Sequence, residues 1–489
     1  MRLSFLGTLS VSAILILTSP HTIFAANKAL DQFTSDDLSR FPRPLSPMAS
    51  LVYQKAMESA LTFPTKTPTP PHLIGASGRL ISHLVEFGNS KEFARRVITP
   101  VILQAQEEVL LTTFIYSKDS PTAVEIREAL IELDRKQKIV NAGRSVSQRR
   151  RIRVWLAIDS FGAAFYDHKP FPPNALTQSK SKIDPAFYNL PRPEDVPALD
   201  LRVRAIHHGL LGALHTKMIV VDGRLAVVGS KNIDGDTCME YTMALEGSIA
   251  WSLRADFQRI WAGDRAYRKA QMQVLKQRGV KDMDQSILDV IFEDEDQVGD
   301  LLDDELGDRA LPQLEAVRPI TGPRPGDVPM LLVGRVQGNH LYSHQEVNPQ
   351  DVAWITAMDN AKHEIYIQTP NFVAKSAADA VERAVRRGVT VIVVTAWSQQ
   401  DFREAIQPNS VGSNRGTAVD LFKRLNDDPV AGKRLKFCWF ISDKTPDSAT
   451  KHATREDWSH IKAMFIDRAM GIIGSGYVFF PKHPPSNAL

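Results

Sequence analysis

The chain has 489 residues, of which 43% are apolar and 24% charged, a globular composition that excludes global disorder. The only long apolar run lies at the start, which excludes a polytopic membrane protein. Residues 282–308 carry twelve acidic and no basic side chains, so 59 basic side chains face 44 acidic ones in the remainder. A basic body indicates an anionic substrate or partner, either phospholipid or nucleic acid.

The N-terminal segment has the three parts of a secretory signal peptide. Arg2 precedes the apolar residues 5–18, and the small residues Ala25 and Ala26 follow. Because the apolar stretch is short for a transmembrane helix, we expect cleavage after Ala25 or Ala26, with an uncleaved membrane anchor as the alternative. This pattern predicts a secreted or lumenal protein with a signal peptide at residues 1–25.

Strand and helix patterns alternate from residue 108 onward. Residues 108–116 predict a strand, and Ser120 with Pro121 predicts the N-cap and first turn of a helix. Strands at 152–158 and 199–206 follow, separated by a Pro-rich loop.

The same order recurs about 250 residues later. Ser376 and Asp379 form a capping-box pattern at the start of the repeated helix, and Gly388 marks its end. The predicted strands of this part are at residues 364–368, 389–395 and 435–441.

This recurrence predicts an α/β fold with a duplicated domain. The joint falls in an acidic and Pro-rich stretch, which is long for a connection and is expected to carry a helix of its own. The predicted division is a signal peptide at 1–25, a first half at 26–280, a linker at 281–329 and a second half at 330–489 that is truncated at its end.

One spaced motif occurs near the end of each half. A His and a Lys stand two positions apart, an Asp follows after four residues, and a Gly-Ser pair follows after six more. The copies are His215, Lys217, Asp222, Gly229 and Ser230 in the first half, and His460, Lys462, Asp467, Gly474 and Ser475 in the second. A single copy is as often a structural His beside a surface Lys, but agreement of both copies favours function.

The residue types of the motif suit phosphodiester cleavage. Residues i and i+2 of an extended segment share a face, so His215 points with Lys217 and His460 with Lys462. Where two such halves meet, one imidazole can attack phosphorus and the other can protonate the leaving oxygen, while the lysines neutralise developing charge. No metal and no cofactor are needed. The residues predicted to bind the phosphate are Ser230, Asn232 and Ser475.

The duplicated His-x-Lys-x4-Asp pattern resembles the mark of the phospholipase D superfamily. The resemblance implies two similar phospholipase D-like α/β sandwich halves packed as a pseudo-dimer around one active site. By family habit His215 is the nucleophile and His460 the general acid, although the sequence alone permits the reverse. Asp222 and Asp467 are implied to have a supporting, structural role.

The activity implied by the resemblance is that of a phospholipase D-like phosphodiesterase working at a phospholipid membrane surface. It would hydrolyse or transfer glycerophospholipid headgroups through a phosphohistidine. The expected export and the stretch 368–371 (Gln-Thr-Pro-Asn), which is similar to one in lipid enzymes of this kind, favour this reading. A nuclease of the same superfamily, with nucleic acid as substrate, is the alternative that the basic surplus supports.

The end of the chain departs from the family pattern. No Asn stands two residues after Ser475, and no acidic residue follows Asp467. A third hypothesis is therefore a catalytically inactive relative that binds lipid or nucleic acid. The two cysteines, Cys238 and Cys438, exclude a disulfide framework and leave either one bond between them or buried thiols.

Overall fold

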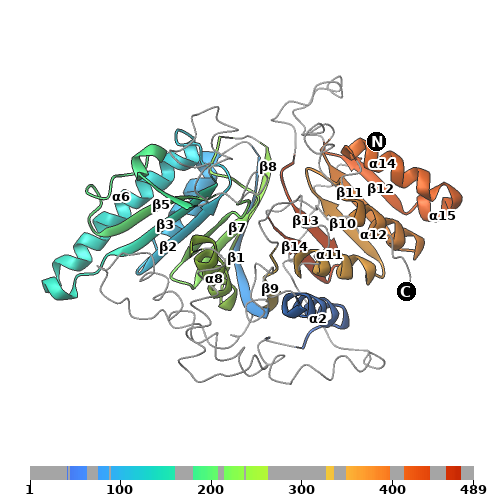
Figure 1. Ribbon diagram of the computed structural model, residues 1–489, viewed down its shortest axis with the longest axis horizontal. Coiled ribbons are helices and arrows are strands. Elements are labelled where there is room, and N and C mark those ends of the chain that lie inside the picture. Colours follow the sequence, from blue (N-terminus) through green and yellow to red (C-terminus); the bar gives the residue numbers. More distant parts are fainter. Residues whose placement is uncertain are drawn as a thin grey trace.

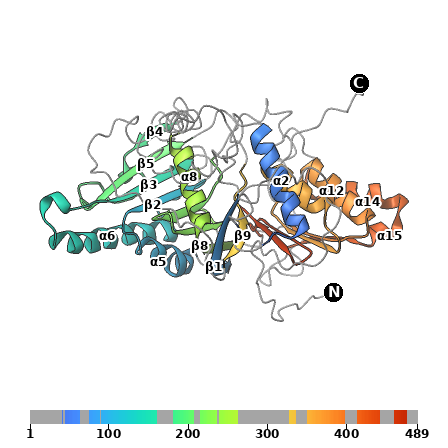
Figure 2. The same cartoon turned by 90° about the horizontal axis from the view of Figure 1, so that it is seen from below.

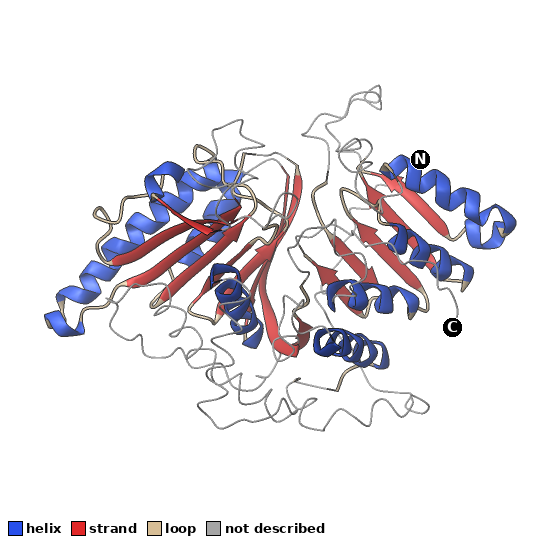
Figure 3. Ribbon diagram, viewed as in Figure 1, coloured by secondary structure: helices blue, strands red, loops and turns tan. Residues whose placement is uncertain are grey.

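The computed structural model describes residues 41, 44–62, 75–87, 90–159, 180–206, 214–235, 238–262, 327–334, 349–396, 412–440 and 459–474. The predicted signal peptide, the acidic segment and Ser475 lie outside these residues. Two α/β bodies lie side by side, each built on one sheet with helices against it (Figures 1 and 3). Within the described part of the chain, no helix has the length and apolar character needed to span a membrane.

The first body contains a nine-stranded sheet in the order β4-β5-β3-β2-β6-β7-β8-β1-β9. Strands β5, β3 and β2 run parallel, and all other neighbours are antiparallel. The strands are β1 Gly75–Phe87, β2 Glu108–Thr113, β3 Ile152–Asp159, β4 Lys180–Ile183, β5 Leu199–Ile206, β6 Met218–Val221, β7 Leu225–Gly229, β8 Met239–Glu246 and β9 Val328–Leu331. Strands β2 and β3 are buried along their whole length, as parallel strands covered on both faces are.

The second body contains a five-stranded sheet in the order β12-β11-β10-β13-β14. Its strands are β10 Glu364–Gln368, β11 Thr390–Thr395, β12 Leu435–Trp439, β13 Ala463–Ile466 and β14 Met470–Ile473. The larger helices of the two bodies are α2 Pro47–Thr62, α6 Pro121–Ala142, α8 Ser248–Ala262, α11 Pro349–Asp359, α12 Lys375–Arg386 and α14 Asn414–Arg424. The shorter helical segments are α4 Ser90–Phe93, η2 Ala94–Ile98, α5 Thr99–Ile102, η3 Val146–Gln148, η4 Pro185–Tyr188, η5 Leu425–Asp427 and α15 Pro429–Gly432.

The two sheets share one topology. The strand run β5-β3-β2-β6-β7 has the same order and directions as β12-β11-β10-β13-β14: three parallel strands, then an antiparallel hairpin. This repeat confirms the predicted α/β fold of two similar halves. The first sheet is larger because β8, β1 and β9 continue it beyond the hairpin.

Local sequence signals located most of these elements correctly. Strands β2, β3, β5, β10 and β12 begin at the predicted residues, because runs of β-branched and apolar residues mark them. Ser120 caps α6, its Oγ accepting a hydrogen bond from the backbone N–H of Ala123 at 3.2 Å. Gly388 follows α12 with φ +99°, a conformation that favours glycine.

The predicted capping box of α12 is wrong. The helix begins at Lys375, and its N-cap residue Ala374 makes no side-chain cap. Asp379 instead binds Nζ of Lys375 at 2.7 Å and the guanidinium of Arg424 at 2.6 Å. The helix starts before Ser376, so that its hydroxyl lies inside the first turn rather than ahead of it.

No disulfide bond links the two cysteines. Cys238 is buried just before β8, whereas Cys438 is exposed on β12. The two predicted alternatives, a bond between the halves or a pair of buried thiols, therefore both fail for Cys438.

Two segments cross between the bodies. Helix α2 precedes the first sheet in sequence, yet Tyr53 and Met57 belong to the same hydrophobic core as Trp354 of α11. Figures 1 and 2 show α2 beside the helices of the second body. In the opposite direction, β9 precedes α11 in sequence but pairs with β1 at the edge of the first sheet.

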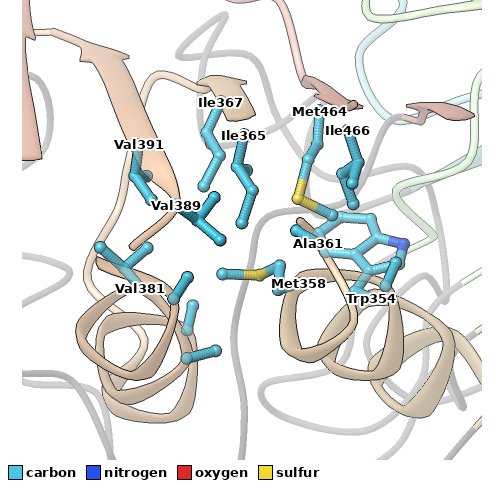
Figure 4. Packing of buried hydrophobic residues seen from close by; sticks show 14 of the residues in the cluster. Trp354, Met358, Ala361, Ile365, Ile367, Val381, Val389, Val391, Met464 and Ile466 are labelled. Atoms are coloured by element: carbon cyan, nitrogen blue, oxygen red, sulfur yellow. The ribbon is translucent and has the colours of Figure 1, made fainter. Parts of the chain in front are cut away.

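The core of the second body lies between its sheet and helices α11 and α12 (Figure 4). Ile365 and Ile367 project from β10 toward Met358 of α11, and Val391 lies beside them on β11. All four side chains are 3% exposed or less. Burial of one such side chain stabilises the fold by about 1.5–3 kcal/mol, so this layer holds β10, the strand with which β13 of the second motif pairs.

Candidate active site

Both motifs occupy the same position in their sheets. His215 and Lys217 directly precede β6, and His460 and Lys462 directly precede β13, the first strand of each antiparallel hairpin. The hairpins turn on two residues with positive φ: 51° and 57° at Asp222 and Gly223, and 51° and 53° at Asp467 and Arg468. Each loop has three residues, 222–224 and 467–469. The third donates its backbone N–H to the last residue of the preceding strand, at 3.0 Å to Val221 and at 2.9 Å to Ile466, so both are tight turns, as the Asp222-Gly223 pair predicts.

The motif aspartates tie each hairpin to the central strand of its sheet. Each carboxylate accepts three backbone N–H hydrogen bonds of 2.8 to 3.0 Å from the residues that open β2 or β10. The donors are Gln106, Glu107 and Glu108 for Asp222, and Lys362, His363 and Glu364 for Asp467. Asp222 also pairs with Arg224 at 3.1 Å. Both aspartates thus have structural contacts, largely with backbone rather than with cations.

The first motif brings its imidazole and ammonium groups together. Lys217 is buried, and its Nζ donates to the backbone oxygen of His215 at 2.9 Å and lies 3.2 Å from Nδ1 of the same residue. The ring of Phe114, just after β2, packs on His215 with centroids 4.8 Å apart. His215 and Lys217 therefore share a face, as their spacing predicts.

The second motif repeats this lysine contact and adds a carboxylate from the first half. Nζ of Lys462 donates to the backbone oxygen of His460 at 2.9 Å, and both side chains are buried. Nδ1 of His460 lies 2.8 Å from Oε1 of Glu240, on β8 of the first sheet. The backbone N–H of His460 donates to the carbonyl of Met239 at 2.8 Å, where β8 faces the second body (Figure 1). The second motif is thus joined to the first half by backbone and side-chain contacts.

Glu240 is a candidate functional residue outside the predicted set of site residues. It is 1% exposed, and its second carboxylate oxygen accepts a hydrogen bond from the hydroxyl of Ser230. Burial alone would raise the pKa of Glu240, but His460, Lys231 and Lys462 outweigh burial and lower this pKa to about 2. Glu240 is therefore ionised at neutral pH. The only sequence signal is its place ten residues after Ser230, which does not say which residue it contacts.

The cations of the two motifs influence one another. Burial lowers the pKa of Lys217 well below its ordinary value and Lys462 lowers it further, while nearby carboxylates, Glu240 among them, oppose this shift. Burial also lowers the pKa of His460, with Glu240 raising it and Lys462 and Lys217 lowering it. Glu240, which contacts both Ser230 after the first motif and His460 of the second, is the direct structural link between the two motifs.

The residues predicted to bind the phosphate differ in which hydrogen-bond donors they have left for it. Ser230 donates its single hydroxyl proton to Glu240, so in this arrangement it supports the carboxylate and has no proton left for a phosphate. Asn232 is buried, and its Oδ1 accepts from the backbone N–H of Ile115 at 3.4 Å, which leaves its amide protons as donors. Ser475 lies outside the described residues.

The stretch 368–371 lies where β10 ends. Nε2 of Gln368 donates to Oγ of Ser459 at 2.8 Å, next to the second motif. Asn371 is 2% exposed, and neither polar atom of its carboxamide has a hydrogen-bond partner among the described residues. A buried amide without partners is costly, so Asn371 is a candidate for contact with substrate.

The comparisons with known proteins bear on the second half most directly. Residues 354–476 match the model of a family described as "Cardiolipin synthase, PLD-like domain". No curated protein matches the chain. One similar solved structure is phosphatidylserine synthase from Haemophilus influenzae Rd KW20, at 11% identity and TM-score 0.39, with 84% of this chain and 80% of that chain covered. Another is NucT from Helicobacter pylori, at 13% identity and TM-score 0.24, with 37% of this chain and 93% of that chain covered. The family match, which ends one residue after Ser475, confirms the predicted resemblance to the phospholipase D superfamily: residues 354–476 are similar to a phospholipase D-like domain.

Proposed function

We propose that the chain is a phosphodiesterase of the phospholipase D type, which cleaves or transfers glycerophospholipid headgroups through a phosphohistidine and needs no metal ion for catalysis. The observation that carries the proposal is the contact of Glu240 with His460. It fixes an imidazole of the second motif with a carboxylate of the first half, beside the buried Lys217 and Lys462. Two histidines and two lysines are the groups that in-line transfer of a phosphoryl diester requires.

The hydrogen bonds support a division of roles between the histidines. When Nδ1–H of His460 donates to Glu240, the lone pair of the ring is on Nε2, which is then the nitrogen that can attack phosphorus. When the ammonium of Lys217 donates to Nδ1 of His215, the ring proton is on Nε2, from which a leaving oxygen can be protonated. We therefore assign His460 as the nucleophile and His215 as the general acid, the reverse of the family habit.

The reaction then proceeds in two balanced steps. Nε2 of His460 forms a bond to phosphorus and the bond from phosphorus to the leaving oxygen breaks. That oxygen takes the proton from Nε2 of His215 while the ammonium of Lys217 passes a proton to Nδ1 of the same ring, so that the ring stays a neutral imidazole. Water or an alcohol next gives its proton to Nε2 of His215 and attacks phosphorus, which breaks the phosphorus–nitrogen bond, and the Nδ1 proton returns to Lys217, which restores all three side chains. A bound phosphodiester brings negative charge to Lys217 and Lys462, which favours their ammonium forms and stabilises the charge that develops.

Several features support a phospholipid as the substrate. The matched family description names an enzyme of phospholipid synthesis, and the stretch 368–371 lies beside the second motif. The basic surplus outside the acidic segment suits an anionic membrane surface, and the expected export places the protein in a secreted or lumenal compartment, soluble or held by an N-terminal anchor. The same surplus also suits nucleic acid, so a nuclease is the second candidate.

The test is turnover by the purified mature chain on mixed phospholipid vesicles and on single-stranded DNA in parallel, with EDTA present. We expect headgroup release by the wild type and none by His215→Ala or His460→Ala. Release of nucleotides instead would establish the nuclease. Silence on both substrates, with binding to either retained, would overturn both enzymes in favour of an inactive binding protein.

A further inference from the structure

One cluster beside the proposed nucleophile has the chemistry of a metal site. Ligand atoms of Cys238, Glu240 and His460 all lie within 4.8 Å of one another, and the three residues are buried. Sγ of Cys238 is 3.5 Å from Oε1 of Glu240, and Nδ1 of His460 is 2.8 Å from the same oxygen. Cys238 directly precedes β8 and Glu240 is two positions further on, so in extended chain the two side chains share one face.

The distances of the Cys238 sulfur and the His460 nitrogen from Oε1 of Glu240 are close to those around a tetrahedral zinc ion. Zinc binds sulfur at about 2.3 Å and nitrogen or oxygen at about 2.0–2.2 Å, which places tetrahedral ligand atoms about 3.4–3.6 Å apart. The sulfur–oxygen distance of 3.5 Å already agrees with this value. The 2.8 Å nitrogen–oxygen contact is a hydrogen bond, and it must lengthen by about 0.6 Å when a cation replaces its proton. Three protein ligands leave a fourth position for water.

The charge of the cluster explains why binding of a divalent cation depends on Cys238. Lys217 and Lys462 act on His460, and both would repel a further cation. A thiolate at Cys238 together with the Glu240 carboxylate supplies two negative charges, which balance a divalent cation. On binding, the Cys238 thiol releases its proton to solvent.

We propose that Cys238, Glu240 and His460 bind a thiophilic divalent cation such as Zn²⁺, and that the bound cation inhibits catalysis by occupying Nδ1 of His460. A neutral imidazole carries one proton, so a metal at Nδ1 leaves that proton on Nε2. Nε2 then has no lone pair to attack phosphorus. The inhibitory part rests on the proposed phosphodiesterase function, whereas the binding part does not.

The binding part is tested with Co²⁺ as a spectroscopic probe on the full mature chain after removal of metals. We expect one equivalent of Co²⁺ with a thiolate-to-cobalt charge-transfer band, which Zn²⁺ displaces. Cys238→Ser keeps a hydroxyl donor toward Glu240 and removes the soft ligand, so this variant should fold and lose the band. Cys438→Ser is the matched control and should keep it. Absence of the band from the wild type, or its loss in Cys438→Ser alone, overturns the site.

The inhibitory part is tested by two readouts, one of which needs no turnover. Zn²⁺ should inhibit headgroup release, and EDTA should restore the activity. The Zn²⁺ concentration for half-inhibition should be at least about tenfold higher for Cys238→Ser than for the wild type. Zn²⁺ should also slow the modification of His460 by diethyl pyrocarbonate, read by mass spectrometry, in the wild type but not in Cys238→Ser. Equal sensitivity of the two proteins in this modification overturns inhibition through Cys238. If the chain shows no turnover, the proposed phosphodiesterase function is overturned. The cobalt and modification experiments then still decide whether Cys238, Glu240 and His460 bind a metal ion.

Discussion

Oε1 of Glu240 lies 2.8 Å from Nδ1 of His460, although the two residues are 220 positions apart and come from opposite halves of the chain. The contact joins the larger sheet to the second motif at the point where β8 faces the second body. A residue from one half thereby sets the ring orientation and tautomer of the proposed nucleophile in the other. The active site therefore depends on correct packing of the two halves.

Replacement of Glu240 by Gln should lower kcat/KM by about 10²–10⁴-fold, because the carboxamide has no charge and can present its NH2 group as well as its oxygen to Nδ1 of His460, so it no longer fixes the tautomer of the ring. The acidic limb of the pH–rate profile should also move to lower pH. Glu240 raises the pKa of His460, so its removal lowers that pKa, and the ring stays neutral into more acidic solution. The measurement is kcat/KM against pH. Glu246→Gln on the same strand, whose carboxylate pairs with Arg79, is the control and should change little.

The covalent intermediate should form on His460. With a substrate whose leaving group needs no protonation, such as a nitrophenyl phosphodiester, His215→Asn should still give a burst of phosphorylated enzyme and His460→Asn should give none. Rapid quench and peptide mapping would locate the phosphoryl group. A label on His215 would reverse the assignment of nucleophile and acid made above.

The two motif aspartates should differ in their contribution to stability. Asp222→Ala removes the acceptor of three backbone N–H groups, including the buried one of Glu108, and should lower the free energy of unfolding by about 2–4 kcal/mol. Asp467→Ala should cost less, because the N–H groups of Lys362 and His363 are exposed and water can replace the carboxylate. Urea titration of both variants would compare them. An equal loss would contradict the role of burial.

The carboxamide of Asn371 should matter for substrate and not for folding. Asn371→Leu keeps most of the volume and removes polar atoms that have no partner among the described residues, so the free energy of unfolding should be unchanged within about 1 kcal/mol. Activity should fall, seen mainly as a higher KM.

Asn414→Leu provides the contrast. The side chain of Asn414 forms hydrogen bonds with the backbone of Pro370, Phe372 and Ala396, so this variant should have a strongly reduced free energy of unfolding. Full activity of Asn371→Leu would rule out a substrate contact of this residue.

The strands and the paired motifs could be predicted because their signals are local. Ile365 and Val391 belong to short apolar runs that fit strands of a covered sheet, and the two motif copies repeat one spacing. The partner of His460 could not be predicted in this way. The chain holds many acidic residues, and only the packing of β8 against the second body selects Glu240.

Ser376 shows how a local signal can fail. A Ser followed three positions later by an acidic residue resembles a helix start, but two ion pairs of Asp379 on the helix surface compete for the carboxylate. The position of α2 is a failure of a different kind. Its apolar residues, Tyr53 and Met57 among them, indicate burial, but nothing in them says which half they bury against.

The exchange of α2 and β9 means that the two halves cannot be separated as independent folding units. After a single protease cut within residues 263–326, the amino-terminal fragment would carry α2, which belongs to the core of the second body. The carboxy-terminal fragment would carry β9, which belongs to the sheet of the first body. Each fragment alone would expose the surface that the missing element covers. The nicked protein should therefore stay together as one particle and unfold in a single transition. Changes in the length and charge of residues 263–326 should likewise leave the distance between the two motifs unchanged.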